Sequence, residues 1–432
     1  MGVLMEENKA KREDDDMISK LPDTLISEIL FYLPTKEAVR TSVLSNRWRS
    51  LWLLVPGLDL DSCEFLDFNA FSSFVNKCLD FSRENELCLH KLKLSIHQDE
   101  NENHNQFCVT RWIDFVAKGK LKHLDVERFL KRKCLEVIMP VSLFVCQTLV
   151  YLRLSRVLFS TSFEESSSVS LPRLKTLRLE LNVYSNETSL ESLISYIPVL
   201  EDLTIVRRVG DNVKYLRVRS QTLTSLRIKF QLRRQSEYYG EVDVLVVRGY
   251  GQGGFLIDAP RLKYLNIEDE RTTIKTITNL GSLNKVNLLG SFFIRGDDQD
   301  RKFFTSLSGV RDMNLSRASF LYFMNVVPLP QFCNLYQLEV GLCYFSFFDR
   351  LLMFLPSCPK LRSLILNLIG YWGKMSLSSE HLCLLSSLEF VEMECIFRRY
   401  PSLELVISNP QDTASTSESE IFHARRKFFR LK

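Results

Sequence analysis

The sequence predicts an α/β protein in which three short N-terminal helices are followed by a curved solenoid with a parallel sheet on its concave side. Three observations support this. Apolar residues recur at helical spacing near the N-terminus, a short leucine motif recurs through the rest of the chain, and its copies are nearly evenly spaced. With 432 residues, the chain is long enough for both parts.

The composition excludes several classes of protein. The hydrophobic fraction is 45% and the charged fraction 25%, as in ordinary globular proteins, and the net charge of +4 gives no argument for nucleic acid binding. No run approaches the roughly 20 apolar residues that span a bilayer. The charged N-terminus does not resemble a secretory signal. We therefore expect no nucleic acid, no membrane, and an intracellular protein of the nucleus, the cytoplasm or both.

The cysteines predict neither a metal site nor a disulfide framework. There are eleven, an odd number, and none forms a Cys-x-x-Cys pair. We expect free, mostly buried thiols, as in a reducing compartment. His90, His97 and His104 recur every seven residues but flank a polar stretch, which predicts a solvated loop. No cofactor is expected.

After a charged segment over residues 1–16, expected to be disordered, the chain predicts three short helices. Pro22 suits the first turn of the first helix and Pro34 cannot continue it. Second and third helices are predicted over residues 36–44 and 46–55. The apolar stripe of the first helix consists of Leu25, Ile26, Ile29, Leu30 and Leu33. Helices this short bury little surface, so their spare apolar residues need cover, either from the rest of the chain or from another protein.

After Pro56 a motif of the form leucine-x-x-leucine-x-leucine recurs about every 26 residues, a period typical of leucine-rich repeats. In one copy, Leu177 and Leu179 share one face of a strand while Thr176 and Arg178 share the other. Stacked copies would form one continuous core. The central residues are Leu124, Leu152, Leu177, Leu203, Leu226, Leu265, Val286, Met313, Leu338, Leu364 and Val391. We assign residues 58–379 to these repeats.

The outer side of the solenoid is predicted to be part helix and part strand. Residues 67–82 and 110–119 have helical periodicity, whereas residues 212–223 and 243–247 have the pattern of strands. A glycine-rich stretch over residues 249–254 fits a dinucleotide-binding motif. A strand-like segment follows it instead of a helix, so we expect a turn there and no nucleotide.

Residues 21–52, LPDTLISEILFYLPTKEAVRTSVLSNRWRSLW, closely resemble an F-box, and we assign the F-box to residues 17–57. The resemblance implies docking on the Skp-type adaptor of a cullin–RING ubiquitin ligase. The positions that it implies as adaptor contacts or their immediate support are Leu21, Pro22, Ile26, Ile29, Leu30, Leu33, Pro34, Val39, Leu44 and Trp48.

An F-box followed by such repeats resembles a large plant family of F-box leucine-rich-repeat proteins, many of which end in a domain called FBD. Residues 382–395, LCLLSSLEFVEMEC, resemble the front half of that domain, but the chain then departs from its pattern. We expect a partial FBD-like segment or last repeat over residues 380–407 and a disordered tail over residues 408–432. The resemblance therefore implies no function that requires a complete FBD.

The expected function is that of a non-catalytic substrate-recognition subunit of an SCF-type (Skp–cullin–F-box) ubiquitin ligase. Its partners would be the adaptor, through it the cullin and RING subunits, and an unknown protein target bound on the concave face. Candidate target-binding residues are Arg153, Arg178, Arg227, Lys229 and Tyr264. Two alternatives remain. One is a scaffold outside any ligase that sequesters a partner, and the other is a receptor for a small ligand.

Overall fold

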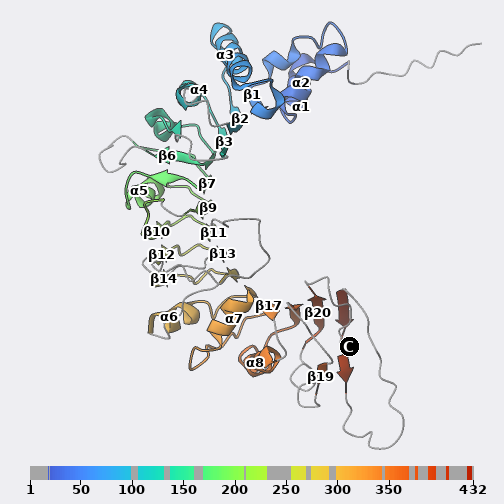
Figure 1. The fold of residues 1–432 in the computed structure, drawn as a ribbon, viewed down its shortest axis with the longest axis vertical. Coiled ribbons are helices and arrows are strands. Elements are labelled where there is room, and N and C mark those ends of the chain that lie inside the picture. The colour runs from blue at the N-terminus through green and yellow to red at the C-terminus, as the bar shows by residue number, and fades with distance from the viewer. Residues whose placement is uncertain are drawn as a thin grey trace, which may run out of the picture.

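The computed structural model describes residues 18, 20–98, 106–130, 137–159, 169–208, 211–230, 254–268, 274–290, 298–342, 346–368, 375–377, 388–395, 405–407 and 426–430. The described chain forms a long stack of strands with a small group of helices at its N-terminal end (Figure 1). The stack bends, so that its two ends lie toward the same side of the molecule. In the described part of the chain, no helix is both long and apolar enough to cross a bilayer.

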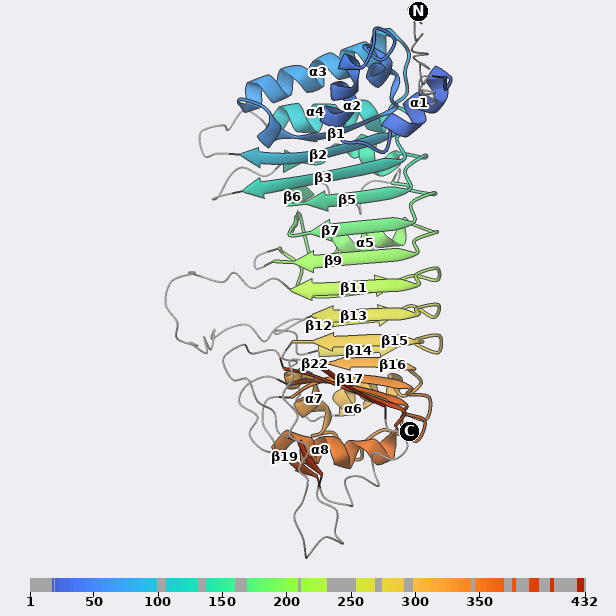
Figure 2. The same ribbon diagram turned by 90° about the vertical axis from the view of Figure 1, so that its right-hand side faces the viewer.

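One sheet of 14 strands runs the length of the stack, and its strands are parallel except for the last. Figure 2 looks onto its concave face, where the strands follow one another like rungs while helices such as α5 (Ser189–Ser195) lie behind them. The strands, in spatial order, are β1 (Gly57–Asp61), β2 (Lys91–Gln98), β3 (His123–Leu130), β5 (Tyr151–Ser155), β7 (Thr176–Glu180), β9 (Asp202–Arg207), β11 (Ser225–Phe230), β13 (Tyr264–Glu268), β15 (Lys285–Leu289), β16 (Asp312–Leu315), β17 (Gln337–Leu342), β18 (Ser363–Leu368), β20 (Phe390–Cys395) and β22 (Arg426–Arg430).

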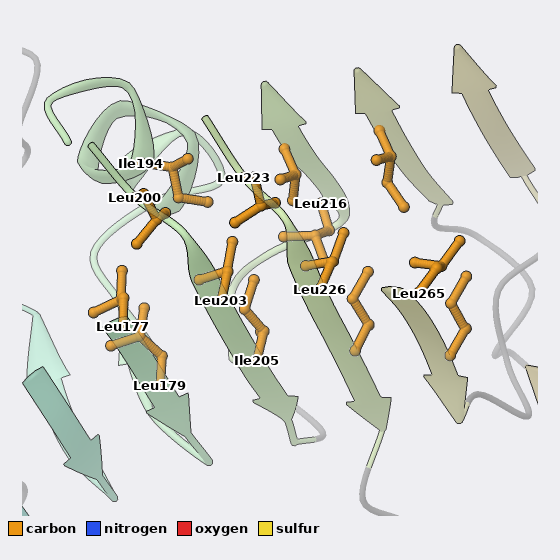
Figure 3. Packing of buried hydrophobic residues seen from close by; sticks show 14 of the residues in the cluster. Leu177, Leu179, Ile194, Leu200, Leu203, Ile205, Leu216, Leu223, Leu226 and Leu265 are labelled. Carbon is orange, nitrogen blue, oxygen red and sulfur yellow. The ribbon is translucent and has the colours of Figure 1, made fainter. Parts of the chain in front are cut away.

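The predicted line of central residues, Leu124 to Val391, is confirmed, because each pairs in register with the next along the sheet. Figure 3 shows part of this line, with Leu177, Leu203 and Leu226 pointing into the core between the main sheet and the outer layer. All three are 0% exposed. Each leucine buried in this way contributes about 2 kcal/mol relative to an exposed one.

The outer layer is part helix and part strand, as predicted. Helices α3 (Phe68–Glu84) and α4 (Gln106–Ala117) cover the first repeats. Next come two three-stranded sheets, β4 (Val137–Ile138), β6 (Val157–Phe159) and β8 (Val183–Tyr184), then β10 (Tyr215–Arg219), β12 (Gly254–Asp258) and β14 (Ile274–Thr278). Later elements are α6 (Asp298–Ser306), α7 (Arg317–Phe323), α8 (Ser346–Phe354) and the paired β19 (Met375–Leu377) and β21 (Leu405–Ile407). Residues 243–247 lie outside the described residues.

The line of central residues is longer than the predicted one, and the last strand was not predicted. Leu58 of β1 and Leu92 of β2 stand in register with Leu124, so the line begins two rungs earlier, within the residues 58–379 assigned to the repeats. At the other end, residues 426–430 of the expected disordered tail form β22, antiparallel to β20. A sheet that ended at β20 would present a row of unpaired backbone groups, and β22 pairs with that edge. Sequence periodicity cannot show such pairing, because β22 is no copy of the repeat.

The N-terminal helices are shorter than predicted. They are α1 (Asp23–Leu30) and α2 (Thr35–Arg40), followed by the 3₁₀ turns η1 (Thr41–Val43) and η2 (Leu51–Leu54). Pro22 and Pro34 both lie just before a helix. The α-helix predicted over residues 46–55 was wrong. That segment forms turns and η2, and its buried residues Trp48 and Leu51 are three residues apart, which suits the tighter 3₁₀ geometry.

Candidate docking sites

The N-terminal helices enclose a small apolar core. Its buried members, between 0% and 6% exposed, are Ile26, Leu30, Ala38, Trp48 and Leu51. Both helices and the segment after η1 contribute to it, which explains how such short elements stay together. An ion pair of 2.6 Å between Arg47 and Asp23 ties that segment to the start of α1. Residues 20–55 therefore form one small unit, called here the N-terminal module.

The same module leaves large apolar side chains in contact with solvent. Leu25, Ile29 and Leu33 are spaced by four residues, so they share one face of α1 and the turn that follows. They are 44%, 49% and 38% exposed, and Val43 and Leu44 at the end of η1 are 86% and 65% exposed. Exposed apolar side chains on so small a unit are typical of an interaction surface.

The structure separates the predicted adaptor contacts into surface and support. The exposed ones are Pro22, Ile29, Leu33, Pro34 and Leu44. Leu21 and Val39 are half-buried. The buried ones are Ile26, Leu30 and Trp48. These last three hold the module together and, in this structure, do not reach its surface.

Sequence reasoning did not assign adaptor contact to Leu25, Tyr32 and Val43, which are 44%, 84% and 86% exposed. The helical spacing between Leu25 and Ile29 was available as a signal for Leu25. Helical spacing also put Val43 on the apolar side of the second predicted helix, four residues after Val39, but Val43 lies in a 3₁₀ turn where that helical phase does not hold.

The N-terminal module packs directly on the first repeat. The backbone N–H of Asp59 on β1 donates to Thr35 Oγ1 on α2 over 2.8 Å. Trp52 of η2 stacks on Phe74 of α3, with ring centroids 6.2 Å apart, and it contacts the cores of both the module and the solenoid. The two parts are therefore joined by hydrogen bonding and shared apolar packing.

On the concave face, Arg153 of β5 is surrounded by carboxylates. Its Nε and Nη2 donate to both oxygens of Glu180, over 3.0 and 2.8 Å. Its Nη1 donates to Glu127 over 2.7 Å and to Asp125 over 3.3 Å. Hydrogen bonding to Glu180, above all, raises the pKa of Arg153. Burial raises the pKa of the Asp125 carboxyl, although the charge of Arg153 opposes this.

Two further predicted residues are also paired within the sheet. Arg227 Nη1 on β11 lies 2.9 Å from Asp202 Oδ2, and Lys229 Nζ lies 2.9 Å from Glu268 Oε1. The guanidinium of Arg227 also lies 4.9 Å from the ring centroid of Tyr264. Most of the basic charge predicted for this face is therefore matched by carboxylates on neighbouring strands.

Arg178 of β7 differs from these three residues in its lack of an ion pair with the described residues. Among the described residues it has no carboxylate partner, and both oxygens of Glu180, two positions further along β7, bind Arg153. Its guanidinium lies 5.8 Å from the ring centroid of Tyr151. Its Nε is shielded from solvent and has no hydrogen-bond partner. Of the four basic residues predicted to bind a target, Arg178 is thus the one that forms no ion pair with the described residues.

Possible metal ligands meet at one place in the described chain. One ligand atom each from Asp61, Cys63 and His97 lies within 4.8 Å of the others. Asp61 accepts a hydrogen bond from the Cys63 N–H over 2.8 Å and lies 3.4 Å from His97 Nε2, and the His97 ring stacks on Phe129 at 4.2 Å. These contacts account for the positions of Asp61 and His97 without an ion.

Two cysteines behave as apolar core residues. Burial raises the pKa of the Cys78 thiol to about 12 and is also the main cause that raises the pKa of Cys358 to about 12. Both thiols therefore stay protonated at neutral pH, which makes them poor nucleophiles and poor metal ligands.

Comparison with known families agrees with this architecture. Residues 18–58 match the F-box domain, and residues 109–293 match the leucine-rich repeats of the FBD-associated F-box protein At5g56370. The first match covers the N-terminal module and part of β1. The second covers the repeats from α4 to just beyond β15.

Similar proteins from Arabidopsis thaliana match nearly the whole chain. The putative FBD-associated F-box protein At5g22720 is 51% identical over 95% of this chain and 88% of its own length. The FBD-associated F-box protein At5g44490 is 52% identical over 88% of this chain and 78% of its own length. The putative F-box/FBD/LRR-repeat protein At5g22610 is 49% identical over 90% of this chain and 81% of its own length. The chain belongs to the plant family of FBD-associated F-box proteins with leucine-rich repeats.

Proposed function

We propose that this protein is the substrate-recognition subunit of an SCF-type ubiquitin ligase. In this role its N-terminal module docks on a Skp-type adaptor, which links it to cullin and RING subunits, while the repeats hold a protein target. Proteins with an F-box and such repeats generally serve as non-catalytic adaptors, and this chain would contribute proximity, which raises the effective concentration of the target.

The observation that carries the proposal is the exposed apolar surface of the module. Leu25, Ile29, Leu33, Val43 and Leu44 stay in contact with solvent, and none of them packs against the core of the solenoid. Covering these side chains with a partner would release a free energy of about 25 cal/mol for each Å² of apolar surface removed from water. The repeats do not cover them, so another protein is the natural occupant.

The test is binding of the purified full-length chain to a purified plant Skp-type adaptor by isothermal titration calorimetry. Ile29→Asp and Leu44→Asp place a charge on the exposed surface and should weaken binding by a factor of about 30 or more, because the desolvated charge finds no partner. Val327→Asp is a matched control, since Val327 is 74% exposed and lies after α7, far along the chain.

Substitution of the buried residues would be a weaker test of adaptor binding than substitution of the exposed ones. Leu30 and Trp48 are 1% and 6% exposed, so Leu30→Asp or Trp48→Ala would disrupt the module and abolish binding for that reason alone. Adaptor affinity that is the same for wild type, Ile29→Asp and Leu44→Asp would contradict the proposal and favour a scaffold outside the ligase.

A further inference from the structure

Basic side chains line the edge of the main sheet at which its parallel strands begin, on the right in Figure 2. Two positions of each repeat lie at this edge, one residue and three residues before the strand. In the described repeats these positions hold nine exposed basic residues, and the acidic residues there are Glu201 and Glu389. The nine, called here the basic edge, are Lys120, Lys122, Arg173, Lys175, Arg261, Lys263, Arg311, Lys360 and Arg362.

The basic edge concentrates the positive charge of the molecule. Nine cations against two carboxylates leave an excess of seven charges there, whereas the whole chain has a net charge of only +4. The rest of the chain is therefore net negative. A surface that collects one sign of charge in this way attracts partners of the opposite sign and raises their rate of association.

The described residues compensate little of this charge. Lys175 pairs with Glu201 over 2.8 Å and Arg362 with Glu389 over 2.6 Å, and the four side chains are between 45% and 55% exposed. Exposed pairs of this kind are weak, so a partner can replace them. The members of the basic edge that form no ion pair with the described residues and are exposed to solvent are Lys120, Lys122, Arg173, Arg261, Lys263, Arg311 and Lys360.

The edge and the concave face differ in how their charges are matched. On the concave face, Arg153, Arg227 and Lys229 are paired with carboxylates of neighbouring strands. At the edge, the turns between repeats bring cations together with few acidic residues among them. The larger excess of positive charge therefore lies at the edge of the sheet, beside the face for which the sequence predicts it.

The backbone fixes the spacing of the edge residues. From β3 to β20, the residue just before each strand donates its N–H to the carbonyl of its counterpart in the preceding repeat, over 2.8–2.9 Å. Lys263, Arg311 and Arg362 stand on every second rung of this ladder, so their backbones are about 10 Å apart at the usual strand spacing. Tyr336 lies between the last two and is 39% exposed, and its ring centroid is 5.0 Å from the guanidinium of Arg311.

We propose that the basic edge binds an acidic segment of the target protein, with carboxylates opposite Lys263, Arg311 and Arg362. An apolar side chain of the segment lies over Tyr336. An extended peptide advances about 3.3 Å per residue, so acidic residues three positions apart match the spacing of the cations. This inference rests on the proposed function, because it names the class of target that the repeats would select.

An acidic protein segment suits the edge better than a nucleic acid. Every nucleotide carries a phosphate, so a strand that follows the edge would place negative charge beside Glu201 and Glu389. A polypeptide can carry neutral residues at those points. Proteins that bind single-stranded nucleic acid also stack bases on aromatic side chains, and among the described edge positions Tyr336 is the one tyrosine, phenylalanine or tryptophan.

The test uses the full-length chain, alone and with its adaptor, and fluorescein-labelled peptides read by fluorescence anisotropy. One peptide of about 15 residues carries glutamate at every third position with leucine and serine between, and its control has glutamine in place of glutamate. The acidic peptide should bind at least about tenfold more tightly than the control. At about 0.5 M salt the screening length of about 4 Å is shorter than the spacing of the cations, so this preference should disappear.

Lys263→Glu combined with Arg311→Glu should weaken binding of the acidic peptide about tenfold or more, because two attractions become two repulsions. Lys214→Glu combined with Arg219→Glu is the matched control. These two exposed residues lie at β10 in the outer layer, so the change in net charge is the same and binding should be unchanged. Tyr336→Ala should weaken the acidic peptide about threefold and should have no effect on an acidic peptide with serine in place of leucine.

Three results would overturn the inference. One is equal binding of the acidic and glutamine peptides, or equal binding of the acidic peptide by the wild type and the edge variant. Another is an equal loss in the control variant, which would assign the effect to the net charge of the chain. The third is tighter binding of an oligouridylate of about 15 nucleotides that the edge variant abolishes, which would make the edge a nucleic acid surface.

The adaptor titration separates the two proposals. If the chain binds the adaptor but shows no preference for the acidic peptide, the basic edge is not the recognition surface and the ligase proposal stands. If the acidic peptide binds as expected but the chain does not bind the adaptor, the basic edge is a binding surface on a protein outside the ligase.

Discussion

Arg153 and Arg178 stand next to each other in register on neighbouring strands of the concave face, yet their surroundings differ. Arg153 contacts Asp125, Glu127 and Glu180 and is 18% exposed. Arg178 has no carboxylate partner among the described residues. The comparison shows that the same residue type, in the same position of two repeats, can join an ion-pair cluster in one and form no ion pair with the described residues in the other.

The largest expected effect is loss of the Arg153 cluster. Arg153→Gln leaves three carboxylates close together without a cation, so the chain should lose about 3 kcal/mol of its free energy of unfolding. Urea unfolding of the full-length chain, followed by circular dichroism, measures this. An unfolding midpoint equal to that of the wild type would show that the cluster is a solvated surface feature and would remove the contrast with Arg178.

The pH dependence of that loss sharpens the comparison. Burial raises the pKa of Asp125 above its ordinary 3.8, and the charge of Arg153 works against this rise. In Arg153→Gln the folded-state pKa should therefore rise further. A carboxyl with a raised folded-state pKa destabilises the fold above that pKa, and the cost disappears as the pH falls through it. The gap in midpoint between wild type and Arg153→Gln should be widest at pH 7 and should narrow toward pH 4.

The smallest expected effect is at Arg178. Arg178→Gln removes a charge with no ion pair and only a distant ring contact, so the free energy of unfolding should change by less than about 0.5 kcal/mol. The same urea experiment measures it. A loss as large as that of Arg153→Gln would show that Arg178 is a structural residue and would remove the contrast between the two arginines.

Much of the fold could be predicted from the sequence because each repeat carries its own signal. The line from Leu124 to Val391 was visible as spacing alone, and the structure confirms its register. The rung at Leu92 was not recognised, because the polar stretch after it looked like a loop. The β22 strand could not be predicted, since pairing with β20 depends on an edge that exists only after the sheet forms.

The candidate sites were less predictable than the fold. Helical spacing predicted which apolar residues of the N-terminal module share one face of a helix. It could not show that Ile29 faces solvent while Leu30 is buried. Likewise, Arg153 and Arg178 look equivalent in the sequence. Glu180 follows Arg178 by two positions, yet it binds Arg153 on the preceding strand. Such cross-strand partners depend on three-dimensional register.

The contact between the N-terminal module and the first repeat has a consequence for target choice in the proposed ligase. Because Thr35 bonds to β1 and Trp52 packs into both cores, the module cannot swing freely on the stack. In the proposed ligase, the direction from the adaptor to the concave face would therefore be fixed. Only lysines at a certain distance and bearing from the bound segment would come within reach of the ubiquitin-charged enzyme. Selection would then depend on where a target carries its lysines, as well as on how tightly it binds.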